Sequence, residues 1–219
     1  MPAQSPFQNH QAEGYLSQAM NPKIRESLDP AYFARLYEAN ADPWQFETSA
    51  YERGKYCSSL MALPLEHYHC GFEIGGSIGV LTSMLADRCD RLLSVDVSPV
   101  AQQRARNRCA DRPNVEFRVM RFPRQTPLET FDLIVFSEVG YYFCLPELAI
   151  ARSWIAEALQ PGGHLLLVHW TPSVEDYPLT GDEVHEHFLE MTPTPLNRIF
   201  HQESVNYRID VLARPSLLP

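Results

Sequence analysis

The chain lacks any apolar run that approaches the roughly 20 residues needed to cross a bilayer. Its N-terminus also lacks the charged-then-apolar pattern of a secretory signal. Basic side chains are scarce, with 18 Lys and Arg against 27 Asp and Glu, so the net charge is −9. Because non-specific nucleic-acid binding and docking on an anionic membrane both need a basic surface, we expect neither partner.

Paired cysteines are missing as well. The five cysteines are odd in number and none has CxxC spacing: Cys57, Cys70, Cys89, Cys109 and Cys144. We therefore expect free thiols and a cytoplasmic location, with neither a disulfide framework nor a zinc site. No HExxH pair is present, and His185 and His187 would point in different directions on a helix. The sequence predicts no metal site.

What is present indicates one substantial core, since 45% of the 219 residues are hydrophobic. Residues 1–28 are rich in Gln, Asn, Ser and Pro and are predicted to form a flexible arm. Residues 29–219 are predicted to be a single domain. Within it, 29–66 should form a helical lid with helices near 29–40 and 48–63, and 67–219 an α/β core.

Apolar segments and helical patterns alternate from residue 70 onward. Strands are expected near 70–74, 91–96, 114–119, 131–137 and 163–169, with helices near 79–88, 99–110 and 146–159. Strands separated by helices give a parallel sheet with right-handed crossovers. Pro161-Gly162-Gly163 is expected to turn sharply into the fifth strand. After a short helix near 181–190, segments 196–201 and 207–213 read as an antiparallel hairpin. The predicted fold is a doubly wound, seven-stranded, mostly parallel sheet.

A glycine turn stands at the centre of this pattern, in the stretch FEIGGSIG at 72–79. Glu73 ends an apolar segment, and Gly75 and Gly79 frame a turn that opens into a helix. About 20 residues later, Asp96 closes the next apolar run, where a carboxylate can grip a ribose. A cap of the following helix is the alternative role for Asp96. The dinucleotide pattern GxGxxG fails because Ile74 stands at its first position, which disfavours a nicotinamide oxidoreductase.

The spacing E-x-G-x-x-x-G resembles the first motif of the class I S-adenosylmethionine-dependent methyltransferases. Across residues 30–215 the layout resembles the NodS family of nodulation N-methyltransferases. The most similar pieces are DPW at 42–44, SEVGYY at 137–142 and LQPGGHLLL at 159–167. The resemblance implies a class I methyltransferase fold, S-adenosylmethionine as cofactor and S-adenosylhomocysteine as product. It also implies a small-molecule acceptor, because that family N-methylates the deacetylated amino sugar of a lipo-chitooligosaccharide.

The same resemblance implies a set of cofactor-binding residues. It places Glu73, Gly75, Gly76, Gly79 and Asp96 around the cofactor, and the carboxyl ends of the strands, where open α/β sheets bind ligands, add Val97, Arg121, Phe122 and Ser137. Phe122 would pack on the adenine, since Met120-Arg121-Phe122-Pro123 stands where the family commonly has an aspartate. From the lid, Trp44 would cover the cofactor, and Tyr51, Arg53 or Lys55 would approach its carboxylate. Core packing of Trp44 and a solvated helix face around Lys55 remain the alternatives.

Methyl transfer mainly needs alignment, together with an acceptor that presents a lone pair. Glu138, which follows the fourth strand, is the first choice for holding or deprotonating an amine, followed by Tyr141 and His169. Glu138 could instead bind the cofactor or loop backbone, and His169 could be a core imidazole. Two other functions stay open: a small-molecule O-methyltransferase and a non-catalytic protein that binds S-adenosylmethionine.

Overall fold

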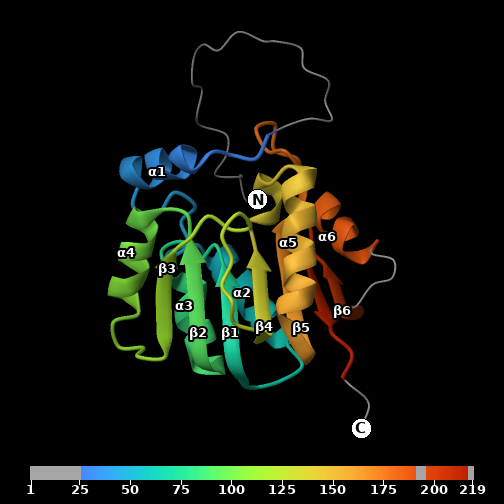
Figure 1. Ribbon diagram of the computed structural model, residues 1–219. Helices are drawn as coiled ribbons and strands as arrows, with labels where there is room; N and C mark the ends of the chain where they lie inside the picture. The colour runs from blue at the N-terminus through green and yellow to red at the C-terminus, as the bar shows by residue number, and fades with distance from the viewer. Residues whose placement is uncertain (1–25, 191–195, 217–219) are drawn as a thin grey trace.

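The computed structural model describes residues 26–190 and 196–216. Of the predicted arm at 1–28, only 26–28 belong to these ranges. Seven strands form one sheet in the order β3-β2-β1-β4-β5-β7-β6 (Figure 1). Their bounds are β1 Tyr68–Ile74, β2 Cys89–Asp96, β3 Val115–Val119, β4 Phe131–Ser137, β5 Leu159–Trp170, β6 Asn197–Glu203 and β7 Tyr207–Ala213. β7 pairs antiparallel with both neighbours and the other ladders are parallel, which confirms the predicted fold.

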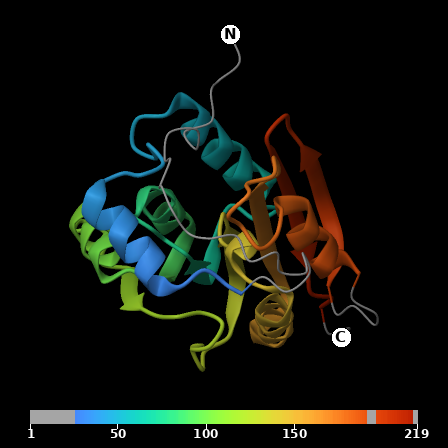
Figure 2. The same ribbon diagram turned by 90° about the horizontal axis from the view of Figure 1, so that it is seen from above.

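Helices cover both faces of the sheet. Their bounds are α1 Pro30–Ala39, α2 Ala50–Ala62, α3 Val80–Leu85, η2 Ala86–Arg88, α4 Pro99–Arg108, η3 Gly140–Tyr142, α5 Leu145–Ala158 and α6 Gly181–Leu189. One core contains side chains of α5 and α6, and a second, on the opposite face, contains those of α2 and α3 (Figure 2). α1 lies over the carboxyl edge of the sheet, beside α4 (Figure 1). The lid and the carboxyl ends of the strands therefore meet.

Local chemistry explains where the helices begin. The Asp29 side chain accepts a hydrogen bond from Ala31 N, and Pro30 occupies the first turn of α1. Ser98 caps α4 in the same way. Thr180 and Glu183 form a reciprocal capping box at α6.

None of the helices in the described ranges is long and apolar enough to cross a bilayer.

The start of β5 differs from the prediction. The expected turn at Pro161-Gly162-Gly163 lies inside the strand, as a bulge where the β4–β5 register shifts between Phe131 and Leu133. Gly162 adopts a positive φ of 79° and donates its N–H to Arg214 O at 2.8 Å. The backbone can therefore bend here without leaving the sheet, because glycine tolerates this conformation and the end of β7 supplies the hydrogen bond.

Candidate functional site

A cavity of about 270 Å³ opens above the carboxyl ends of β1, β2 and β4, beneath the lid. Most of the residues predicted to bind cofactor or acceptor line it: Trp44, Tyr51, Lys55, Glu73, Gly75, Gly76, Asp96, Val97, Arg121, Phe122, Ser137, Glu138 and Tyr141. Gly79 and His169 do not line it. Such a cavity, at the point where strand order reverses, is where open α/β sheets bind ligands.

The glycine turn has no room for side chains. Gly75 has a φ of 81°, and a Cβ there would lie 2.2 Å from Val139 Cγ2. A Cβ on Gly76 would lie 2.1 Å from Ser94 Oγ. Gly79 ends the turn with a φ of 83°, and a Cβ there would meet Ala105 Cα at 2.9 Å. Gly79 permits close packing against α4, whereas Gly75 and Gly76 bring bare backbone to the cavity.

Glu73 supports the turn from below. It is 2% exposed, and its Oε2 accepts hydrogen bonds from Thr82 Oγ1 at 2.5 Å and Ser94 Oγ at 2.7 Å. Burial raises the pKa of Glu73 to about 7, against the lowering effect of the two hydroxyls. The turn therefore rests on a buried carboxyl group that holds its proton to a higher pH than a carboxyl in water.

Asp96 connects the turn to α4. Its Oδ2 accepts from Ser77 N at 2.9 Å, and its Oδ1 accepts from Ser98 N at 2.8 Å. Burial raises the pKa of Asp96 to about 6. A carboxylate has about four acceptor sites, so these bonds leave lone pairs for a ligand hydroxyl in the cavity. Asp96 can therefore accept these backbone hydrogen bonds at the start of α4 and also bind the hydroxyls of a ribose.

Lys55 and Glu138 form a buried ion pair between the lid and β4. Lys55 is 3% exposed, and its Nζ donates to Glu138 Oε1 at 2.7 Å and to Glu52 Oε1 at 3.1 Å. Burial alone would lower the pKa of Lys55, but the two carboxylates outweigh it and raise that pKa. Lys55 is thus buried rather than on a solvated helix face, whereas Arg53, two residues earlier on the same helix, is exposed.

Both carboxylate oxygens of Glu138 accept hydrogen bonds. Besides Lys55, its Oε2 accepts from Tyr141 Oη at 2.5 Å and from Trp170 N at 3.1 Å. Its φ of 58° turns the chain sharply after β4. With both oxygens engaged, Glu138 is placed to orient neighbouring groups rather than to act as an unoccupied base. Burial raises the pKa of Tyr141, which keeps its phenol protonated and donating to Glu138.

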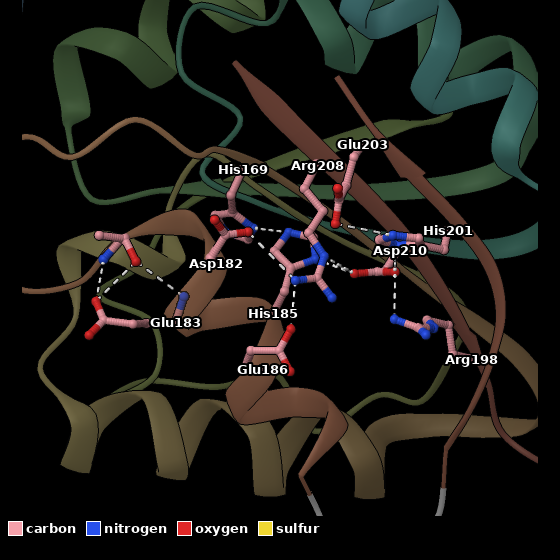
Figure 3. A network of polar contacts seen from close by, with 11 residues as sticks. His169, Asp182, Glu183, His185, Glu186, Arg198, His201, Glu203, Arg208 and Asp210 are labelled. Atoms are coloured by element: carbon pink, nitrogen blue, oxygen red, sulfur yellow. Dashed lines mark hydrogen bonds and ion pairs between the residues drawn. The ribbon is translucent and has the colours of Figure 1, made fainter. Parts of the chain in front are cut away.

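His169 lies outside the cavity, in a buried chain of hydrogen bonds (Figure 3). Its Nε2 accepts from Gly140 N at 3.1 Å, so the neutral ring carries its proton on Nδ1 and donates to His185 Nε2, also at 3.1 Å. His185 Nδ1 then donates to Asp210 Oδ2 at 2.6 Å. Burial lowers the pKa of both histidines and keeps them neutral. The structure gives His169 a supporting position behind the turn that carries Tyr141.

Aromatic side chains enclose the rest of the cavity. Trp44 stacks on Phe46 with centroids 5.5 Å apart, and both line the cavity. The Tyr37 hydroxyl of α1 shares a hydrogen bond with the Ser77 hydroxyl in the glycine turn. This bond connects the N-terminal helices to the turn after β1. Phe122 lines the cavity but also packs on Trp154, 5.4 Å away. A flat ligand ring can therefore lie against an immobilised Phe122.

Sequence reasoning missed several residues of the lining. Among them are Glu52, Glu147 and Asn206. The spacing of three between Glu52 and Lys55 was a usable local signal for an ion pair on a helix. Asn206 lies in the turn between β6 and β7, and no local pattern indicates that it reaches the same cavity as α2.

The fold and the site together define a class of protein. Seven strands with one reversed near the edge, a glycine turn after β1 and an acidic residue at the tip of β2 form the class I methyltransferase fold. The N-methyltransferase NodS of Bradyrhizobium japonicum WM9, solved in complex with S-adenosyl-L-homocysteine, matches with a TM-score of 0.76. It is 25% identical, and the match covers 85% of this chain and 99% of that chain. The described chain has a class I methyltransferase fold.

The family follows from the sequence comparisons. The model for nodulation protein S (NodS) matches residues 34–168, so the chain belongs to the NodS family, as predicted. Nodulation protein S of Rhizobium tropici is 33% identical over 127 residues, 57% of this chain and 53% of that protein. A candidate methyltransferase of Pseudomonas syringae is 37% identical with a TM-score of 0.68, covering 76% of this chain and all of that one. The chain spans about half the length of the curated relatives it matches.

The cavity fits the cofactor that this family membership suggests. The side-chain-free backbone of Gly75 and Gly76 can approach an amino-acid moiety, and Asp96 retains lone pairs for sugar hydroxyls. Phe122 offers an aromatic wall for a base.

In the described part of the chain, all cysteines are free thiols and no cluster of His, Cys, Asp and Glu is arranged to hold a metal ion.

Proposed function

We propose that this chain is an S-adenosylmethionine-dependent methyltransferase that N-methylates an amine on a small, amino-sugar-like acceptor. The observation that carries the proposal is the cavity itself, which combines the glycine turn, Asp96 and the buried Lys55–Glu138 pair. The match to an N-methyltransferase with bound S-adenosyl-L-homocysteine supports both the cofactor and the reaction class. When bound, the cofactor supplies a methyl group that its sulfonium already activates.

The cofactor would lie along the strand ends. Glu73, Gly75 and Gly76 would form the cradle for its amino-acid part, and Gly79 would hold the cradle's shape from α4. Asp96 and Val97 would contact the ribose, and Arg121 and Phe122 the adenine. Trp44, the ring of Tyr51 and Lys55 would cover it from the lid, with Ser137 below, and the Tyr51 hydroxyl would remain available to a second ligand. The shared cavity lining supports every one of these positions except that of Gly79.

The chain's own contribution to catalysis is orientation and exclusion of water. The bonds from Lys55, Tyr141 and Trp170 N fix the Glu138 carboxylate, and the aromatic lid covers the reaction site. We assign Glu138 and Tyr141 to orienting the acceptor beside the reacting methyl. His169 is a positioning residue, since it reaches this site only through Gly140.

The test is methyl transfer to a panel of amino sugars, polyamines and phenols, combined with thermal unfolding. S-adenosylhomocysteine should raise the unfolding temperature in proportion to its affinity, and NAD should not. Methylation confined to amines supports the proposal. Methylation of phenols alone would indicate an O-methyltransferase, and stabilisation without transfer to any acceptor would indicate a binding protein.

A further inference from the structure

The ion pair under the lid is unbalanced in charge. Lys55 Nζ lies 2.7 Å from Glu138 Oε1 and 2.9 Å from Glu52 Oε2, and the three side chains are 2%, 14% and 12% exposed. Among the described residues, Lys55 is the cation paired with either carboxylate. One ammonium therefore faces two carboxylates in a largely buried setting, where an uncompensated charge is strongly unfavourable.

Two polar atoms beside this pair have no hydrogen-bond partner. Glu52 Oε2 and Tyr51 Oη are both buried and unsatisfied. Although Glu52 Oε2 is close to Lys55 Nζ, the aligned hydrogen bond goes to Oε1 instead. Tyr51 and Glu52 are neighbours at the start of α2, and both line the cavity. Unsatisfied buried acceptors are rare in folded proteins, and each calls for an explanation such as a missing ligand.

We propose that Tyr51 and Glu52 form the subsite that takes the acceptor amine in its protonated form, with the Glu52 carboxylate accepting its proton before transfer so that the nitrogen presents a lone pair to the methyl group. The inference rests on the proposed function and adds to it the residues that recognise the substrate. An ammonium brings the donors that Glu52 Oε2 and Tyr51 Oη lack, and its charge balances the excess carboxylate. A neutral alcohol or amide offers no such charge, so the subsite selects cationic amines over hydroxyl acceptors.

The surroundings of the subsite agree with this chemistry. The Tyr51 ring meets Trp170 edge to face at 6.1 Å and Tyr207 at 6.0 Å, which forms an aromatic wall. Lys55 Nζ already lies 5.7 Å from the Tyr51 ring centroid, so this ring lies beside a cation in the structure. Burial raises the pKa of Glu52; Lys55 opposes this rise, and Glu138 adds to it.

Calorimetry on the full chain saturated with S-adenosylhomocysteine tests the proposal without relying on turnover. The probes are glucosamine and cadaverine, each compared with its fully N-acetylated form. The wild type should bind the amines at least about tenfold more tightly than the acetylated forms. Glu52→Gln should weaken amine binding about tenfold or more, and Tyr51→Phe by a few fold, with the acetylated probes unaffected. Glu66→Gln, which alters an exposed glutamate outside the cavity, should change nothing.

The same titrations separate this proposal from its alternatives. If Glu52→Gln weakens S-adenosylhomocysteine binding as much as amine binding, the subsite belongs to the cofactor's own ammonium and the proposal is wrong. Unchanged amine affinity in both variants, or a wild type that binds S-adenosylhomocysteine but neither amine, also overturns it. Failure of the wild type to bind S-adenosylhomocysteine would instead refute the proposed function on which it rests.

Discussion

The backbone N–H of Gly140 donates a hydrogen bond of 3.1 Å to Nε2 of His169. This bond connects the turn that carries Tyr141 to the end of β5, and through His185 to Asp210 on β7. A Cβ on Gly140 would lie 2.9 Å from the same nitrogen, so the two residues fit only with glycine at this position. The C-terminal hairpin thus supports the turn that carries Tyr141, in addition to lining the cavity itself through Asn206.

Asp210→Asn should destabilise the protein and loosen the turn after β4. Asp210 is 0% exposed and accepts from His185, His201 and Arg208, so loss of its charge should cost about 3–5 kcal/mol. Urea unfolding measures the loss, and faster hydrogen exchange of the Gly140 amide reports the turn. Asp182→Asn is the control, because Asp182 is exposed and 3.6 Å from Arg208. An unchanged Gly140 exchange rate would contradict the connection.

Lys55→Met should lower the free energy of unfolding by about 3–5 kcal/mol, because it leaves two buried carboxylates without their cation. The deficit should grow as pH rises and Glu52 ionises, because Lys55 lowers the pKa of that buried carboxyl and its removal takes this effect away. Arg53→Met, on the exposed side of the same helix, should change the stability by less than about 0.5 kcal/mol. Equal effects of the two substitutions would mean that the buried ion pair contributes nothing specific.

Gly76→Ala should destabilise the turn by about 1–3 kcal/mol and weaken S-adenosylhomocysteine binding, since the new Cβ would meet Ser94 Oγ at 2.1 Å. Adding Ser94→Ala removes that atom and should restore part of the stability. Gly54→Ala is the matched control, because nothing lies within 4 Å of its Cβ. It should stabilise α2 by about 0.8–1 kcal/mol. Thermal unfolding and calorimetry of the three variants distinguish the steric effect of the added methyl group at Gly76 from the general effect of replacing a glycine.

Asp96→Ala should reduce S-adenosylhomocysteine affinity by about 1–3 kcal/mol, because a charged acceptor for the ribose hydroxyls is lost. It should also lower stability, since Ser77 N and Ser98 N lose their acceptor. Ser98→Ala removes the α4 cap to Ala101 N without altering the cavity, and should lower stability by about 1 kcal/mol with affinity unchanged. Calorimetry showing full affinity in Asp96→Ala would refute the ribose assignment.

Glu73→Gln should flatten the pH dependence of stability. The folded-state pKa of about 7 lies above the ordinary 4.5, so the folded chain holds a proton that the unfolded chain releases between those values. Stability from this group is therefore present below about pH 4.5 and declines as pH rises to 7, by on the order of 3 kcal/mol. Urea unfolding from pH 5 to 8 should show a shallower slope in the variant. An identical slope would exclude Glu73 as the source, leaving Asp96, whose pKa is also raised.

The sequence by itself determined the fold and the location of the cavity. Alternation of apolar strands and helices, the glycines at 75 and 76 and the acidic tips at 73 and 96 are local signals, because they reflect backbone conformation and one-dimensional periodicity. They predicted a mostly parallel sheet with strands separated by helices, and together with the resemblance to class I methyltransferases they predicted most of the cavity lining. The bulge around Gly162 escaped prediction, since only pairing with Arg214 makes it part of a strand.

Only the tertiary structure decided what each side chain does. Lys55 is buried because Glu138 lies against it from 83 positions away, and His169 is removed from the cavity by partners on α6 and β7. Gly79 packs on Ala105 rather than on the ligand side of the turn. Burial, charge balance and hydrogen-bond satisfaction depend on contacts between distant segments, and these contacts do not exist until the chain folds.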